Sequence, residues 1–297
     1  RFDAYCRQTF LDNVVRGGWP LLLGDDEHPH VYHVYSRKHG DMERDYNAFH
    51  LAAERYSQGN GNYRDVAQNR RSDIFFEPQV DNFNVLSFLS LIQADGYNPL
   101  VVLGQHFTLA EKHHADALAL VERPEPLAEA LARPFTPGGL LHIVSDRALG
   151  LKVDPADFVT TALAHADAHF EAEFGEGYWI DHWFYNLDLI DSTLALYPDR
   201  KRTLLFEKRV PYFQSPASVQ PRDRQYVLTP RGVRRYHALQ EDEHKDEKSL
   251  DHWLRTTAGE VYRPTVFEKL YALALLKFAT IDPWGMGVEM EAGRPGW

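Results

Sequence analysis

Cysteine is almost absent from this chain of 297 residues, in which Cys6 is the single example. A lone cysteine has no partner for an internal disulfide, so the fold does not depend on an oxidising compartment. A reducing cytoplasm would suit the protein, and we expect it to be cytoplasmic. We expect Cys6 itself to be a small buried apolar side chain, as most free cysteines are.

Long apolar runs are also missing. No stretch approaches the roughly eighteen apolar residues that a membrane-spanning helix requires, so we expect no membrane association. The opening stretch RFDAYCRQTFLDNVV lacks the basic start, apolar middle and small-residue cleavage site of a secretory signal. It is typical of an amphipathic helix already under way, so we expect the natural N-terminus to lie further upstream.

Positive charge is scarce. The chain has 32 Lys and Arg against 43 Asp and Glu, a net charge of -11 at pH 7. Proteins that bind nucleic acids concentrate positive charge in order to displace counterions from phosphates. The charge balance therefore argues against a nucleic-acid partner.

The common cofactor motifs are absent as well. The sequence has no phosphate-cradling P-loop, no dinucleotide fingerprint and no Gly-x-Ser-x-Gly nucleophile elbow. Histidines are numerous, but neither His28, His30 and His33 nor His113 and His114 have the spacing of a metalloprotease site, and no cysteines accompany them. We expect neither a metal ion nor an organic cofactor.

Helical patterns and aromatic residues are what the sequence has in quantity. Segments 154–174, 178–198 and 263–283 each combine a helix start signal or a proline stop with a broad apolar face. Prolines at 211, 216, 221 and 230 forbid a continuous helix between them. Six to eight helices joined by long loops predict an all-α fold, an incomplete helical toroid with a few short strands, formed by residues 1–297 as part of one domain.

The segment YSQGNGNYRDVAQNRRSDIFFEP, residues 56–78, is the richest in polar chemistry. Its glycines and asparagines specify an unusual backbone path, and Arg64, Asp65, Gln68 and Asn69 then crowd polar groups ahead of an apolar stretch. Surface arginine pairs would explain this pattern. A guanidinium beside amide and carboxylate groups would equally suit a site that binds a sugar ring together with a phosphate.

A second polar stripe lies on the expected helix 178–198. Asp181, Tyr185, Asp188 and Ser192 recur at helical spacing and are flanked by tryptophans. The stripe is either a solvent-facing surface or the wall of a pocket. Asp181 and its neighbour His182 are candidate wall residues.

Four separated blocks of sequence together carry a resemblance to a known family. They are YSRKHGDMERDYNAFHLAAERYSQGNGNYRDVAQNRRSDIFF, GYWIDHWFYNLDLIDSTLALYPD, LLFEKRVPYFQSPASVQPRDRQYV and GMGVEMEAGRPGW. From about residue 17 to its end the chain resembles the catalytic module of bacterial β-1,3-glucan phosphorylases, large relatives of the cellobiose and chitobiose phosphorylases. The resemblance implies an incomplete (α/α)6 barrel, without the N-terminal β-sandwich and the C-terminal part of the barrel.

The resemblance also implies site residues. Trp297 matches the Trp of a Trp-Asn-Asp-like motif whose acid is the proton donor, so the donor is expected two residues after Trp297 and no catalytic residue is expected in this chain. Arg64, Asp65 and Gln68 match an Arg-Asp-x-x-Gln-Asp loop near the sugar, while Asn69 departs from it. At the end of the chain, Glu289 and Glu291 are expected to shape the loop or bind sugar hydroxyls.

The implied activity is inverting phosphorolysis of β-1,3-glucan oligosaccharides to α-glucose 1-phosphate. Inorganic phosphate is the co-substrate, and a homodimer is compatible with the resemblance. An inverting glycosidase needs two carboxyl groups, whereas phosphate is already an anionic nucleophile and requires only groups that hold it in place. Two alternatives remain open: an inverting β-glucan hydrolase, with Asp65 or Asp181 as its base, and a noncatalytic carbohydrate-binding module.

Overall fold

The structure is a computed structural model, and every structural statement below concerns its described residues. These are residues 2–10, 18–25, 27–34, 54–174, 184–234, 239–241 and 252–279. They fall into two compact units. Unit 1 comprises residues up to 69 together with 75–80 and 102–171, and unit 2 comprises 70–74, 81–101 and the described residues from 172 onward.

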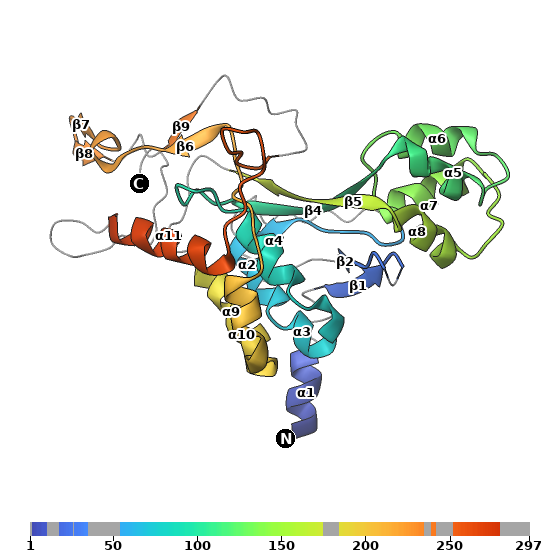
Figure 1. The fold of residues 1–297 in the computed structure, drawn as a ribbon, viewed down its shortest axis with the longest axis horizontal. Helices are drawn as coiled ribbons and strands as arrows, with labels where there is room; N and C mark the ends of the chain where they lie inside the picture. The colour runs from blue at the N-terminus through green and yellow to red at the C-terminus, as the bar shows by residue number, and fades with distance from the viewer. Residues whose placement is uncertain are drawn as a thin grey trace. The chain divides into compact units, whose positions relative to one another are not determined.

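The described residues form a mixture of helices and β-sheets, so the predicted all-α fold and incomplete (α/α)6 barrel are wrong (Figure 1). The segment 154–174, expected as one helix, shows the reason for the error. Only α8 (Pro155–Leu163) is helical, and β5 (Ala166–Glu173) follows it. Within β5 the sequence ADAHFEAE alternates small or apolar residues with polar ones, which is the period of a strand rather than of a helix.

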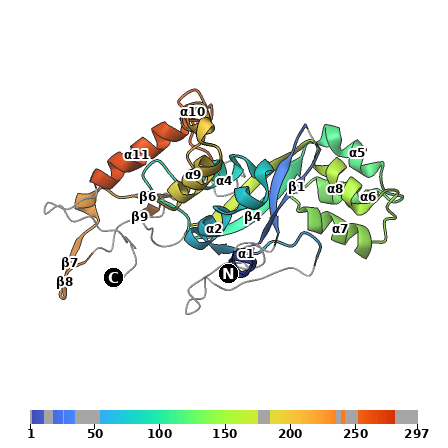
Figure 2. The same cartoon turned by 90° about the horizontal axis from the view of Figure 1, so that it is seen from below.

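Unit 1 contains a β-hairpin and a group of four short helices. Strand β1 (Trp19–Leu23) pairs antiparallel with β2 (His30–Val34), so that Leu21 lies opposite Tyr32. The helices lie close together in both ribbon views (Figures 1 and 2). They are α5 (His114–Leu118), α6 (Glu125–Leu131), α7 (Pro137–Asp146) and α8, preceded by the 3-10 helix η4 (Glu111–His113).

Side-chain caps begin two of these helices. The Thr136 hydroxyl accepts a hydrogen bond from the Gly139 amide at 2.9 Å, and an Asp154 carboxylate oxygen accepts one from the Ala156 amide at 2.8 Å. Each cap satisfies a backbone donor that the first turn leaves unpaired. The start signal expected at 154–155, an aspartate cap followed by proline, is therefore confirmed. The helices pack around one apolar core in which Phe107 and Phe158 are fully buried.

A three-stranded sheet, in the order β3-β4-β5, supports this core. Its strands are β3 (Gly61–Asn62), β4 (Val101–Leu109) and β5. Along β4 the side chains of Gln105, Phe107 and Leu109 are buried, while those of His106 and Thr108 are half-buried. The alternation places two faces of different polarity on the strand, as a sheet packed on one side requires.

Unit 2 is built from helices and two small hairpins. Helix α4 (Phe83–Ser90) packs against α9 (Phe184–Leu196), and α10 (Lys201–Phe206) packs against α11 (Val266–Ala279). Helices α9 and α11 confirm the predicted helices near 178–198 and 263–283 over their described parts. The pairs β6 (Ala217–Val219) with β9 (Leu239–Glu241) and β7 (Val227–Thr229) with β8 (Gly232–Arg234) are antiparallel.

The remaining elements are short. They are α1 (Phe2–Phe10), α2 (Tyr63–Arg70), α3 (Asp73–Phe76), η3 (Pro78–Val80), η5 (Pro198–Arg200) and η6 (Arg222–Arg224). On α1, Cys6 is exposed, so the expectation that it is buried is wrong. Among the described helices none is long and apolar enough to cross a membrane.

Gly104 of β4 provides a test of this architecture. Its φ of +121° lies in a region that side chains with a Cβ avoid, and an added Cβ would stand 2.8 Å from the Gln58 amide oxygen. We expect Gly104→Ala to lower the free energy of unfolding by at least about 2 kcal/mol, because strain and collision add. Urea unfolding followed by circular dichroism measures the change.

Gly259 is the matched control for this substitution. Its φ is +83°, but an added Cβ would meet nothing within 4 Å. Gly259→Ala should therefore cost only about 1 kcal/mol, the strain of a left-handed backbone. Equal losses in the two variants would show that the Gln58 contact with β4 does not exist in solution.

Candidate functional site

The polar segment predicted from the sequence begins as a loop bound to β4. The side-chain amide of Gln58 donates from Nε2 to the carbonyl of Gln105 at 2.9 Å, and its Oε1 accepts from the Gln105 amide at 2.8 Å. A side-chain amide thus pairs with a strand as another strand would. Next to it, the Tyr32 hydroxyl donates to the Tyr56 carbonyl at 2.9 Å. These bonds hold the loop before the candidate residues.

Helix α2 then carries all four of the candidate residues that the structure describes. Asn62 Oδ1 accepts from the Arg64 amide at 3.1 Å and caps the start of the helix. Arg64 and Gln68 are half-buried and lie one turn apart, and Asp65 and Asn69, also one turn apart, are buried behind them. Arg64 Nε lies 3.4 Å from Asp65 Oδ1. The helix therefore presents one half-exposed guanidinium and one half-exposed amide, backed by buried polar groups.

The buried groups of this segment are incompletely paired. Within the described part of the chain, Ser57 Oγ, Asn60 Oδ1 and Asn69 Nδ2 are buried and have no hydrogen-bond partner. A buried polar group without a partner costs about 1–3 kcal/mol, so few are tolerated in a structural core. Three in thirteen residues are more typical of a region that serves binding than of a simple surface.

The other five candidate residues are Asp181, His182, Glu289, Glu291 and Trp297. All five lie outside the described residues, so their predicted roles stay predictions. On the same stripe as Asp181, Asp188 lies 3.8 Å from Arg71 Nη1 in a half-exposed ion pair. Arg71 is therefore a surface arginine whose ion-pair partner, Asp188, lies on α9.

Arg70, by contrast, is a buried residue that the sequence pattern did not distinguish from Arg71. It is 1% exposed, and its Nη1 lies 3.5 Å from Asp73 Oδ1. Asn84 Nδ2 donates to the Arg70 carbonyl at 3.1 Å and to Asp73 Oδ2 at 2.9 Å. Burial lowers the pKa of Arg70, and the adjacent carboxylate opposes that change. The network ties the end of α2 to α4 and is structural.

Lys269 on α11 is the second buried cation, and it too went unnoticed in the sequence. It is fully buried, its ammonium donates to the carbonyls of Ile92 at 2.9 Å and Pro211 at 2.7 Å, and it stands 4.3 Å from the Tyr212 ring centroid. Burial lowers its pKa well below the usual 10.5. On the same helix Phe267 and Tyr271 are exposed while Lys269 is buried. A surface helix usually has the opposite arrangement, with apolar side chains buried and charged ones exposed.

A pH-dependent stability follows for Lys269. Because its folded pKa is depressed, the unfolded chain binds more protons between that value and 10.5, and the stability of the folded protein rises with pH across this interval. Lys269→Met should remove this rise. We expect the free energy of unfolding of the wild type, relative to the variant, to increase steadily from pH 7 toward pH 10 in urea titrations.

Lys152 is the control, because it is exposed although its ammonium also donates to a carbonyl, that of Ala119, at 2.9 Å. Lys152→Met should change stability by less than about 0.5 kcal/mol at every pH. A constant difference between wild type and Lys269→Met across the pH range would contradict the assigned burial.

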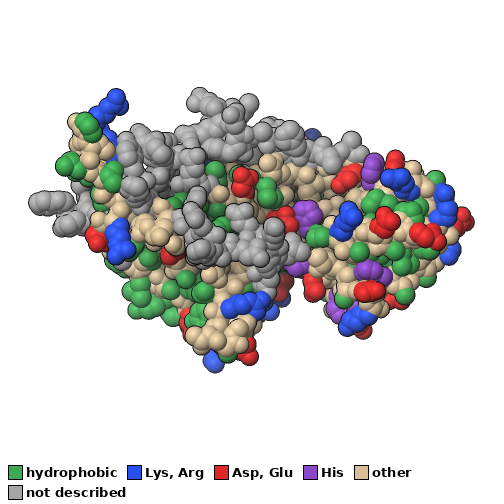
Figure 3. Space-filling view, turned by 90° about the horizontal axis from the view of Figure 1, so that it is seen from above, with side chains coloured by type: hydrophobic (Ala, Val, Ile, Leu, Met, Phe, Trp, Pro, Cys, Tyr) green, Lys and Arg blue, Asp and Glu red, His purple; other side chains and the backbone are tan. Residues whose placement is uncertain are grey.

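A groove on unit 1 is lined by several titratable side chains. Its volume is about 670 Å³, and His106, Glu129, Arg133, Phe135, Thr136 and Arg147 are among its lining residues. None of the candidate residues of α2 lines it. The lining carries both Glu129 and Arg133, so the groove has no single sign of charge. Figure 3 shows acidic and basic side chains interspersed over the described surface at the right of the view.

His106 at this groove pairs with β5. Its Nδ1 lies 3.1 Å from Glu171 Oε2, and the Thr108 hydroxyl lies 2.8 Å from His169 Nε2. The residue number rises from 106 to 108 along β4 while the partner's number falls from 171 to 169 along β5, so the two strands run antiparallel. The Glu171 carboxylate, 3.1 Å from Nδ1, raises the pKa of His106, although burial opposes the rise.

We expect Glu171→Gln to lower the pKa of His106, because the substitution removes the carboxylate that favours the imidazolium. The stabilisation from this pair is present at acid pH and is lost as pH rises through the folded pKa of His106. Titration of the His106 ring protons by NMR measures the shift. An unchanged or higher pKa in the variant would show that the pair does not form, and Glu129→Gln, which alters a groove carboxylate outside the pair, serves as the control.

No metal centre is formed by the residues described here: they contain no group of three or more His, Cys, Asp or Glu side chains placed to hold an ion. In comparisons with known proteins, no family model and no curated protein matches the chain. Neither comparison therefore supplies a role for the residues of α2.

Proposed function

We propose that the chain acts on β-1,3-glucan oligosaccharides, as part of an inverting glycoside phosphorylase. The observation that carries the proposal is the arrangement on α2. Arg64 and Gln68 present a guanidinium and an amide side by side, above the buried Asp65 and Asn69, on a helix held by the Gln58 pairing with β4. The resemblance of this stretch to a sugar-binding loop of the family supplies the substrate class.

The chemistry of these side chains supports a sugar ligand. A sugar ring carries several hydroxyl groups, each a donor and an acceptor, and planar amide and guanidinium groups pair with neighbouring hydroxyls. Arg64 also supplies a fixed positive charge, which suits the phosphate or the sugar phosphate of a phosphorolytic reaction. Rigid support reduces the conformational entropy lost on binding, and here the support comes from Asp65 at 3.4 Å and from the capped start of α2.

The phosphorylase is favoured over the hydrolase by the position of Asp65. A general base must reach the attacking water, but Asp65 is buried and its Oδ1 lies beside Arg64 Nε. A phosphorylase needs no such base, because phosphate arrives as an anion and displaces the leaving oxygen from the opposite face of the sugar ring in one step. Arg64 and Gln68 would orient the glucosyl unit for that displacement.

Calorimetric titration with laminari-oligosaccharides tests the role of α2. Gln68→Ala should weaken binding about tenfold, the loss expected for hydrogen bonds worth about 1.4 kcal/mol. The control Gln79→Ala removes an exposed amide on η3 and should leave binding unchanged. No binding by the wild type, or equal effects of both substitutions, would exclude α2 as the sugar site.

Because the resemblance places the proton donor after Trp297, the activity test uses a chain extended past that residue. Its incubation with β-1,3-glucan, with and without inorganic phosphate, then separates the activities. Formation of α-glucose 1-phosphate that requires phosphate supports the phosphorylase. Release of reducing sugar without phosphate would contradict the phosphorylase and support the hydrolase. Binding without any cleavage would contradict both enzymes and support a carbohydrate-binding role for this chain.

A further inference from the structure

Three histidine rings from three separate elements of unit 1 meet in one cluster, which we call the histidine cluster. His113 of η4 stacks on His165, with ring centroids 4.3 Å apart and an angle of 29° between the ring planes. His28, in the turn between β1 and β2, meets His165 edge-on at 5.3 Å. His165 itself lies between α8 and β5, so the cluster joins segments that are far apart in sequence.

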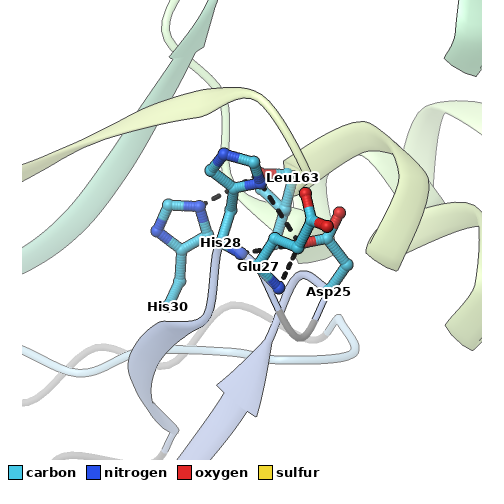
Figure 4. Close-up of polar contacts among 5 residues, drawn as sticks. All are labelled: Asp25, Glu27, His28, His30 and Leu163. Atoms are coloured by element: carbon cyan, nitrogen blue, oxygen red, sulfur yellow. Dashed lines mark hydrogen bonds and ion pairs between the residues drawn. The ribbon is translucent and has the colours of Figure 1, made fainter.

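The turn that carries His28 is organised by a carboxylate. Asp25 Oδ1 accepts from the amides of Glu27 at 3.0 Å and His28 at 2.6 Å, and it lies 3.3 Å from His28 Nδ1 (Figure 4). These bonds lower the pKa of Asp25, the amide of His28 contributing most. The carboxylate therefore stays charged in mild acid, and the turn keeps its own shape there.

His30 attaches the same hairpin to α8. Its Nε2 lies 3.0 Å from the Leu163 carbonyl, which directs the ring toward the end of that helix (Figure 4). Its ring also meets Phe107 of the core edge-on at 5.2 Å. The β1–β2 hairpin is thus held to the helices through imidazole rings at two adjacent points.

Protonation opposes this arrangement. Burial lowers the pKa of His113, and its neighbours His165 and Lys112 lower it further, while Asp116 acts against them. The pKa of His30 is lowered mainly by burial and also by His28, against the opposing effects of the Leu163 carbonyl, Asp167 and Asp25. Stability from a group with a depressed pKa is present above the unfolded value of 6.5 and is lost as pH falls through the folded value.

We propose that the histidine cluster is an acid-sensitive latch. It holds the β1–β2 turn against η4 and the end of α8 while its rings are neutral, and it releases the turn when neighbouring rings become charged. Two stacked imidazolium rings repel each other, and at His113 this repulsion adds to that of Lys112 and is opposed by Asp116. The apolar core of unit 1, in which Phe107 and Phe158 are fully buried, is expected to keep its packing.

Hydrogen exchange followed by mass spectrometry, at pH 7.5 and pH 5.5, tests the latch. After correction for the intrinsic effect of pH, peptides that cover 27–34 and 110–118 should exchange about three- to tenfold faster at pH 5.5, the range expected when one proton is taken up against a depressed pKa. Peptides from α10 and α11 are the internal reference and should not change.

His113→Phe is the decisive variant. Phenylalanine keeps a flat ring against His165 but cannot be charged, so the acid response of the peptides covering 110–118 should disappear while their exchange at pH 7.5 stays as in the wild type. His142→Phe is the matched control, since His142 is an exposed histidine on α7 of the same unit, and it should keep the full response.

Three results would overturn the proposal. They are an acid response that persists in His113→Phe, a wild type without any response between the two pH values, and an equal acceleration in α10 and α11, which would indicate general acid unfolding.

Discussion

The structure depends above all on supplying partners for polar groups that folding removes from water. The Gln58 amide pairs with the backbone of β4, Asn84 bonds to both Arg70 and Asp73, and Lys269 donates to two carbonyls. Each of these side chains joins segments distant in sequence. Because an unmade buried hydrogen bond costs more than a made one contributes, these contacts specify the fold more strictly than apolar packing alone.

The candidate site is the region where this requirement is least completely met. Between Ser57 and Asn69 several buried polar atoms have no partner among the described residues, although the loop is held by Gln58 and the start of α2 by the cap at Asn62. A rigid backbone combined with unused hydrogen-bonding capacity is the state expected of a site prepared for a polar ligand. The histidine cluster differs from the candidate site, because its imidazole rings contact one another. What can change there is the charge of the rings.

Residue patterns predicted the grouping of the polar residues of α2 better than they predicted the fold. The crowded polar residues Arg64, Asp65, Gln68 and Asn69 do occupy one helix, with alternate members half-exposed and buried. The all-α prediction failed at 154–174, where a correct helix start led us to extend the helix through β5. The alternation of ADAHFEAE was visible, but it became decisive only because β4 offers a strand to pair with.

The sequence by itself determined local features: the aspartate cap before Pro155, the helical character of α9 and α11, and the polar stretch around α2. These depend on neighbours a few residues apart, and such interactions can be inferred from spacing. Only the tertiary structure decided that Arg70 is buried and Arg71 exposed, that α11 turns Lys269 inward, and that His28, His113 and His165 meet. The physical reason is that burial and pairing depend on which distant segments pack together. Adjacent residues of the same type, such as Arg70 and Arg71, cannot be told apart by their local sequence.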